Sequence, residues 1–277
     1  MYVLTGFECP FLEIDFFFLV SIFFSQDRGK TPRVLNNAKR IIDLKESLPL
    51  EVDDMGWFWN VVKASGLYPL LQTNYGQVDH GLLIAFSERW HSETSSFHLP
   101  VGEMTITLDD VSCLLHIPVG GNPLFHETLT TNQGTEYLVD YLGLDRAESA
   151  AETESMNSAR ITYDCLLNIY TKYLNKANMY ANQPGEEVTL EWYQTRCIRA
   201  FLLYLVGCTL FSDKTGSGCC VVYLKYFDDL TTVNQWSWGT AALAFLYDYL
   251  CKMTKPKCAS LSGYTCLMQV QFYILNC

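Results

Sequence analysis

The sequence predicts a mainly α-helical protein, a single multi-helix domain with a small two-stranded β-hairpin near residues 96–106. Apolar residues recur every three or four positions through most of the chain, which is the spacing of amphipathic helices. Residues 96–106 break this rhythm, because short β-branched runs there flank a proline and a glycine. With 277 residues and 49% hydrophobic content, the chain can bury a large core.

Three helices are expected before the hairpin, at residues 34–48, 53–66 and 79–90. The first places Val34 on its apolar face, and the second runs from an acidic cap to a glycine stop. Asp79 is the expected N-cap of the third, because a short carboxylate there accepts from the free amides of the first turn.

The hairpin is expected to turn at Pro100 and Gly102 and to lead into a capped helix. Thr107 is the predicted N-cap of that helix, and Asp110 stands three residues later as in a capping box. Asp109 and Asp110 also favour the positive end of the helix dipole.

Residues 122–160 are more polar and are expected to form an exposed connection around one short helix at 135–143. Four long apolar segments follow, at 161–181, 189–211, 236–253 and 260–276. The second of these is apolar on all sides in its later half, which predicts a helix in the centre of a bundle.

The charge balance of 19 basic against 30 acidic residues disfavours nucleic-acid binding through phosphates. The one basic cluster lies within residues 28–45, and such charges commonly serve solubility. Its members are Arg28, Lys30, Arg33, Lys39, Arg40 and Lys45. We therefore expect no direct contact with nucleic acid.

Residues 1–28 are interpreted as an atypical apolar leader. The run Phe16–Phe24 is nine residues long, about half of the roughly 20 that a membrane helix needs, and it lacks the flanks of a signal peptide. No membrane association is expected. The 11 cysteines contain no CxxC pair, and most lie in apolar helical patterns, which indicates a reduced intracellular setting.

Candidate metal ligands occur at His91, His98, Cys113 and His116, but their spacing fits no zinc pattern. We interpret them as structural histidines and a core cysteine. The adjacent carboxylates at 53–54, 109–110 and 228–229 diverge on a helix and suit capping better than catalysis. No catalytic residue, metal site or cofactor is predicted.

A family resemblance rests on residues 66–121, "GLYPLLQTNYGQVDHGLLIAFSERWHSETSSFHLPVGEMTITLDDVSCLLHIPVGG". It continues in "VVYLKYFDDL", "WSWGTAALAFLYDYLC" and "SGYTCLMQVQFYI" in the same order. These words resemble the plant mobile domain of Maintenance of Meristems-like proteins and long-form plant protein phosphatase 7 homologues. The resemblance covers about residues 34–276, which implies a domain at 34–277 that is truncated at its C-terminus, with residues 1–28 outside it.

The resemblance implies a non-catalytic nuclear interaction module of transposable-element-related origin. Such a module acts in gene silencing or transcriptional regulation and in meristem maintenance, through protein partners that include a phosphatase-like nuclear protein. The label "aminotransferase-like" that accompanies this family finds no support here, because no lysine lies in a recognisable pyridoxal-phosphate setting.

Ten residues match the sequence motifs of the family. Their chemistry divides them into a structural set and a polar set. The expected structural set comprises Trp90, Leu99, Pro100, Gly102, Leu108, Asp109 and Val111. Within it, Trp90, Leu99, Leu108 and Val111 are expected to wedge the hairpin onto the helices. The polar set is Arg89, His98 and Glu103, which form either a buried hydrogen-bonded network, the interpretation we favour, or a partner-binding surface.

Two other functions stay open at this point. One is a nucleic-acid-handling domain of a mobile element, with the helix from Leu108 to His116 as a degenerate recognition helix. Its acidic start and lack of basic residues disfavour that role. The other is an enzyme of unknown chemistry that uses Cys113, His98 and Glu103.

Overall fold

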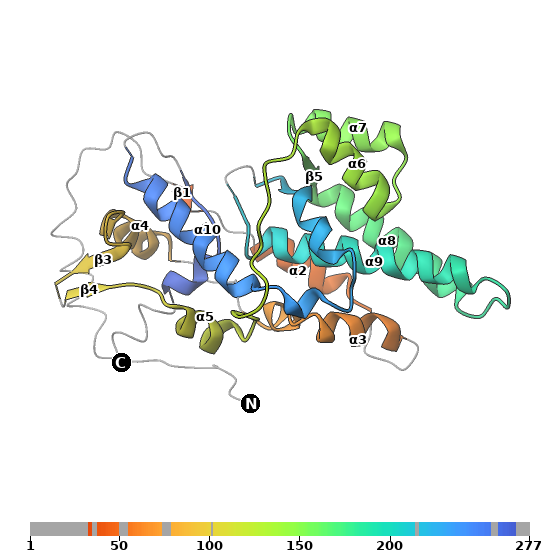
Figure 1. Cartoon of the computed structure of the whole chain (residues 1–277), viewed down its shortest axis with the longest axis horizontal. Coiled ribbons are helices and arrows are strands. Elements are labelled where there is room, and N and C mark those ends of the chain that lie inside the picture. The colour runs from red at the N-terminus through yellow and green to blue at the C-terminus, as the bar shows by residue number, and fades with distance from the viewer. Residues whose placement is uncertain are drawn as a thin grey trace.

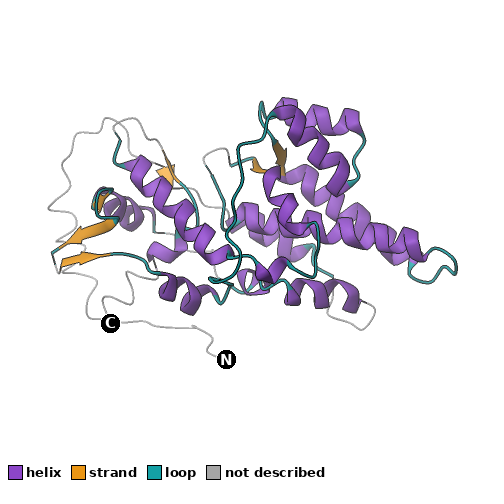
Figure 2. Cartoon of the chain, viewed as in Figure 1, coloured by secondary structure: helices purple, strands orange, loops and turns teal. Residues whose placement is uncertain are grey.

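The computed structural model describes residues 33–34, 38–49, 55–73, 79–100, 102–213, 216–255 and 260–269. Within these ranges the protein is mainly helical, and its strands form three small sheets (Figure 2). This confirms the predicted fold class. No helix in the described ranges combines the length and the apolar character that a membrane crossing requires.

The helices and strands alternate irregularly along the chain (Figure 1). The α-helices are α2 (Ala38–Glu46), α3 (Gly56–Ala64), α4 (His80–Glu88), α5 (Leu108–Leu115), α6 (Thr131–Leu142), α7 (Arg146–Ser155), α8 (Tyr163–Tyr180), α9 (Glu187–Cys208) and α10 (Trp238–Met253). The 3-10 helices are η2 (Tyr68–Leu71), η3 (Val221–Phe227) and η4 (Val233–Gln235). The strands are β1 (Arg33–Val34), β2 (Trp90–His91), β3 (Ser96–Leu99), β4 (Gly102–Met104), β5 (Arg160–Thr162), β6 (Gly218–Cys220) and β7 (Ser260–Leu261).

Helix α9 forms the centre of the core, as its apolar later half predicts. Every residue from Ala200 to Cys208 is buried, and the helix packs against α8, α3, α6 and α2. Each fully buried leucine or phenylalanine there contributes about 1.5–3 kcal/mol. Gly207 lets β6 approach α9 closely. Any larger residue would clash there, because its Cβ would lie only 2.4 Å from the Cβ of Cys219.

The predicted caps of two helices are confirmed. The Asp79 carboxylate accepts a hydrogen bond of 3.0 Å from the Leu82 amide at the start of α4. At the start of α5, Thr107 and Asp110 form a complete capping box. The acidic cap expected for the helix at 53–66 is wrong, because α3 begins at Gly56 with Met55 as an N-cap that makes no side-chain bond.

The N-terminal boundary of the first helix also differs from the prediction. Val34 lies in β1, which pairs in parallel with β7 through the partners Val34 and Leu261. Helix α2 begins only at Ala38. A pairing partner more than 200 positions away decides this local conformation, and helical spacing alone does not reveal it.

Helix α7 lies in the stretch that was expected to be exposed connection. Its sequence, RAESAAETES, has few apolar residues, so its periodicity is weak. Tertiary contacts hold it: the buried hydroxyls of Thr135 and Thr153 lie 2.9 Å apart between α6 and α7. Gly134 lets α6 lie close to the chain that follows α7, because a Cβ at that position would lie only 2.7 Å from the Cα of Ala159.

The last predicted apolar segment, 260–276, begins as strand β7 rather than as a helix. Residues 266–269 are helical, and residues 270–277 lie outside the described ranges, as do residues 1–32 with the apolar run Phe16–Phe24. At the other sheet, β5 pairs antiparallel with β6. Arg160 of β5 makes a largely buried ion pair of 2.6 Å with Asp213.

Candidate functional site

The predicted hairpin belongs to a three-stranded antiparallel sheet at one end of the molecule, opposite the projecting end of α8 and α9 (Figure 1). Strands β3 and β4 pair His98 with Glu103 and Leu99 with Gly102, as expected of the hairpin. The third strand is β2, which pairs Trp90 with Phe97 and His91 with Ser96. The helix expected at 79–90 included Trp90, because a strand of two residues is too short to show a strand pattern.

Aromatic side chains fasten one face of this sheet to α10. Trp90 and Phe97 are buried and meet edge to face at 4.8 Å. The Trp90 ring also contacts Tyr247 of α10 at 4.9 Å, and its indole N–H donates to the Cys251 sulfur at 3.3 Å. The sheet is therefore a fixed platform.

The opposite face carries a polar group that we call the hairpin cluster: His91, Ser96, His98 and Glu103. The Nε2 atom of His98 lies 2.8 Å from Oε1 of Glu103. The His91 ring stacks on His98 with centroids 3.7 Å apart, and the Ser96 hydroxyl donates to the other Glu103 oxygen at 3.1 Å. Although the two atoms of the His98–Glu103 contact are close, the geometry is not that of a hydrogen bond, because Nε2 has no correctly oriented acceptor among the described residues.

The His98 and Glu103 side chains are 41% and 55% exposed. The favoured expectation of a buried network is therefore wrong for this pair. The reason is the two-residue period of a strand, which places Phe97 on the buried face and His98 on the outer face. Arg89 ends α4 and joins the cluster through its main chain, since its carbonyl accepts the His98 amide at 2.9 Å.

The structural signature residues lie partly where they were expected. Val111 is buried and Asp109 stands in the first turn of α5, while Leu99 is half-buried, Pro100 is exposed and Gly102 has a positive φ of 126°. Leu108 is exposed rather than wedged against the sheet, because burial along α5 begins only at Val111.

Cys113 is exposed, which corrects its expected place in the core. It lies two positions after the buried Val111, so the helix turns its side chain by about 200° to the opposite face. Cys113 stands on α5, whereas His98 and Glu103 stand on β3 and β4 (Figure 1). The part of the chain that the structure describes contains no group of three histidine, cysteine or acidic side chains that could hold a metal.

Two features considered for nucleic-acid contact are helix α5, which begins with acidic residues, and Arg40, which has partners within the fold. Helix α5 carries Asp109 and Asp110 in its first turn and no basic residue. The Arg40 guanidinium lies 4.4 Å from the centre of the Tyr163 ring and 3.9 Å from the Asp164 carboxylate.

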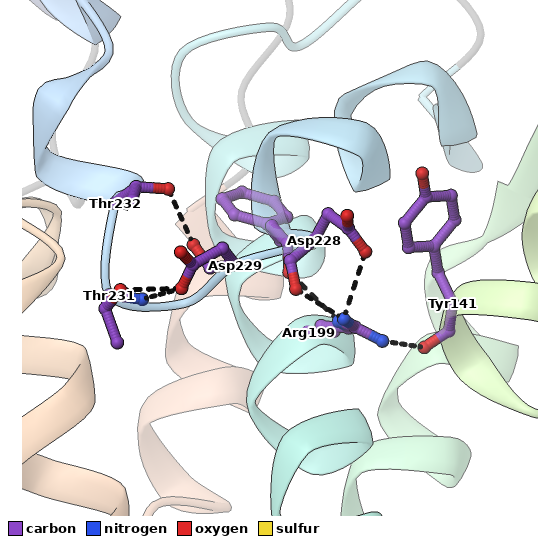
Figure 3. A network of polar contacts seen from close by, with 7 residues as sticks. Tyr141, Arg199, Asp228, Asp229, Thr231 and Thr232 are labelled. Carbon is purple, nitrogen blue, oxygen red and sulfur yellow. Dashed lines mark hydrogen bonds and ion pairs between the residues drawn. The ribbon is translucent and has the colours of Figure 1, made fainter.

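A second polar cluster, the Arg199 junction, consists of Arg199, Tyr141 and Asp228, labelled in Figure 3, together with Phe227. Arg199 donates to the carbonyls of Phe227 at 2.9 Å, Asp228 at 2.6 Å and Tyr141 at 3.3 Å. Its side chain is 11% exposed and lies 3.5 Å from the Asp228 carboxylate. Sequence reasoning missed this residue, although a single arginine beside an entirely apolar stretch is itself a signal of a buried polar contact.

The neighbouring Asp229 closes a turn. Its carboxylate accepts hydrogen bonds from the hydroxyl of Thr231 at 2.6 Å and from the amide of Thr231 at 2.9 Å (Figure 3). These bonds, the side-chain one first, lower the pKa of Asp229. The pair at 228–229 thus has structural partners, as interpreted from the sequence.

The fold and these two clusters define a mainly helical domain that displays polar side chains on a small fixed sheet. The chain belongs to the plant mobile domain family, whose model matches residues 66–274. The match begins after α2 and α3, although both helices pack against α9.

Three relatives from Arabidopsis thaliana illustrate the similarity. Protein MAIN-LIKE 2 is 35% identical over 72% of this chain and 27% of its own length. Protein MAINTENANCE OF MERISTEMS is 31% identical over 83% of this chain and 42% of its own length. Serine/threonine-protein phosphatase 7 long form homolog is 31% identical over 74% of this chain and 14% of its own length. The chain thus spans less than half of each relative, and no solved structure matches it.

Proposed function

We propose that this chain is a non-catalytic interaction module that acts in the nucleus through protein partners. The role is in gene silencing or transcriptional regulation and in meristem maintenance, and the origin is related to transposable elements. Membership of the plant mobile domain family supports this proposal, as does a relative named for the maintenance of meristems. The partner class that we favour is a phosphatase-like nuclear protein.

The observation that carries the proposal is the half-exposed hairpin cluster on a sheet whose other face packs against α10. An exposed ion pair contributes only about 0.2–1 kcal/mol to folding, so the His98–Glu103 pair adds little stability. Both side chains are about half-exposed, and Trp90 holds the strands that carry them in place. A rigid polar surface of this kind suits protein recognition, because little entropy is lost on binding.

The test is affinity purification of the tagged chain from plant nuclei, with a hairpin variant beside the natural sequence. The hairpin variant carries His98→Ala and Glu103→Ala. A matched control carries Arg146→Ala and Glu136→Ala, which removes another exposed ion pair, one of 2.7 Å. We expect a reproducible partner that the hairpin variant loses and the control retains.

Recovery of chaperones alone, or of the same partner with both variants, contradicts the proposal. A fluorescent fusion tests its nuclear part, since exclusion from the nucleus removes that part. The non-catalytic part is tested with p-nitrophenyl phosphate, because one relative is named a phosphatase. Turnover above that of heat-treated protein contradicts it.

A further inference from the structure

A stripe of α9 runs from the projecting end of the α8–α9 pair to the Arg199 junction (Figure 1). Val188, Trp192 and Arg196 lie four positions apart, which places them along one side of the helix, and Arg199 follows one turn later. Exposure falls along this stripe: Val188 is 82% exposed, Trp192 is 37% exposed and the Arg199 side chain is 11% exposed. We call Val188, Trp192 and Arg196 the α9 face.

Arg196 is positioned firmly on this face. Its guanidinium lies 4.0 Å from the centre of the Trp192 ring, which is a cation–π contact. The chain after α6 approaches both residues at Gly143. A Cβ added at this glycine would lie only 2.6 Å from Nε of Arg196 and 2.6 Å from the Trp192 ring. The arginine is therefore oriented before any ligand arrives.

The charge of Arg196 has no matching anion in the described ranges. Its Nε is buried without a hydrogen-bond partner there. Burial first, and then the positive charge of Arg199, lower the pKa of Arg196. By contrast, Arg160 faces Asp213 at 2.6 Å and Arg146 faces Glu136 at 2.7 Å. An unbalanced and partly desolvated cation is costly, and a bound carboxylate offsets that cost.

We propose that the α9 face binds an acidic segment of a protein partner, with a carboxylate on Arg196 and an apolar side chain across Trp192 and Val188. Charge complementarity carries this assignment, because the face offers one oriented cation beside exposed apolar surface. The α9 face is separate from the hairpin cluster and does not depend on it.

The experiment selects peptides from a random displayed library against the full chain and measures the affinity of the enriched peptides by fluorescence anisotropy. We expect enriched sequences in which aspartate or glutamate adjoins a large apolar residue. Arg196→Gln is expected to weaken their binding about tenfold, the effect of one lost charge-assisted contact. The matched control is Lys172→Gln, which removes the same charge from the exposed surface of α8 and is expected to change binding less than about twofold.

A second pair of variants does not disturb the packed part of the helix. Val188→Asp and Val188→Lys place opposite charges at a side chain that is 82% exposed. Asp is expected to weaken the acidic peptide about threefold and Lys to strengthen it by a similar factor. Equal effects from both substitutions, or equal losses in the Arg196 and Lys172 variants, overturn the proposal.

The remaining outcomes also decide the matter. Enrichment of basic peptides, absence of any peptide that depends on Arg196, or self-association that Val188→Asp abolishes would each overturn it. The His98→Ala, Glu103→Ala variant is expected to bind the selected peptides normally. If the hairpin variant loses them while the α9 variants keep them, the α9 inference fails and the proposed function of the hairpin cluster stands.

Discussion

The hairpin cluster and the Arg199 junction each pair a basic side chain with an exposed carboxylate, but the basic side chain is 41% exposed in the first and 11% exposed in the second. His98 and Glu103 face each other across a single hairpin and are half-exposed. Arg199 is 11% exposed and reaches carbonyls of residues that are 28 and 58 positions away in the chain. The comparison teaches that burial and sequence separation, rather than the presence of an ion pair, decide which contact holds the fold together.

The largest expected effect tests the buried side of this comparison. Arg199→Met keeps much of the side-chain volume but leaves the carbonyls of Tyr141, Phe227 and Asp228 without their donor. We expect the free energy of unfolding to fall by about 3–5 kcal/mol, measured by urea denaturation. Arg146→Met is the control, because it breaks an exposed ion pair and should cost less than about 1 kcal/mol. Similar losses in both variants contradict the distinction.

The second effect concerns the buried face beneath the hairpin cluster. Phe97→Ala removes a ring that packs against Trp90 and Phe86 at 4.8 and 5.3 Å. A loss of about 3 kcal/mol is expected, because the site keeps a cavity that the sheet cannot close. Thermal and urea unfolding measure it. Phe125→Ala, at an exposed aromatic residue, should change stability by less than about 0.5 kcal/mol, and a comparable loss there would remove the reason for calling the sheet anchored.

A smaller effect is expected on the outer face of the same sheet. His98→Asn and Glu103→Gln, alone and together, form a double-mutant cycle for the exposed pair. Their coupling free energy should be about 0.5 kcal/mol and should decrease as salt is added. A coupling above about 2 kcal/mol would place this pair with the Arg199 junction as a structural contact and weaken its assignment as a binding surface.

The smallest effect is a pH dependence of stability at His126, which belongs to neither cluster. Its Nδ1 lies 3.0 Å from the Tyr226 hydroxyl oxygen. Burial first, and then Lys225, lower its pKa in the folded state below the ordinary value of 6.5. The folded protein therefore favours the neutral ring, and the stability that it confers is present above pH 6.5 and is lost as pH falls from there through the folded pKa. His126→Asn should reduce the acid-induced fall in melting temperature over that window, whereas an unchanged fall contradicts the assignment.

Local chemistry was enough to predict several elements of the fold. The Thr107 and Asp110 capping box, the Asp79 cap and the turn near Gly102 depend on residues within a few positions of one another. The apolar second half of α9 was also sufficient to predict its central place, because a helix that is apolar on all sides has no face for solvent. The polar set was recognised from the sequence motifs of the family, but its exposure could not be predicted. The alternation of side chains along a strand shows which are exposed only when the buried face of the sheet is known.

The sequence by itself determined the helical class, the main caps, the central helix and the position of the hairpin, because each depends on periodicity or on contacts between near neighbours. Tertiary structure alone decided that Val34 pairs with Leu261, that α7 is held through Thr135 and Thr153, and that Arg199 joins three segments. It also decided that Arg196 stays without an anion in the described part of the chain. The physical reason is that burial and charge balance are properties of what surrounds a side chain, and chain segments far apart in sequence supply those surroundings.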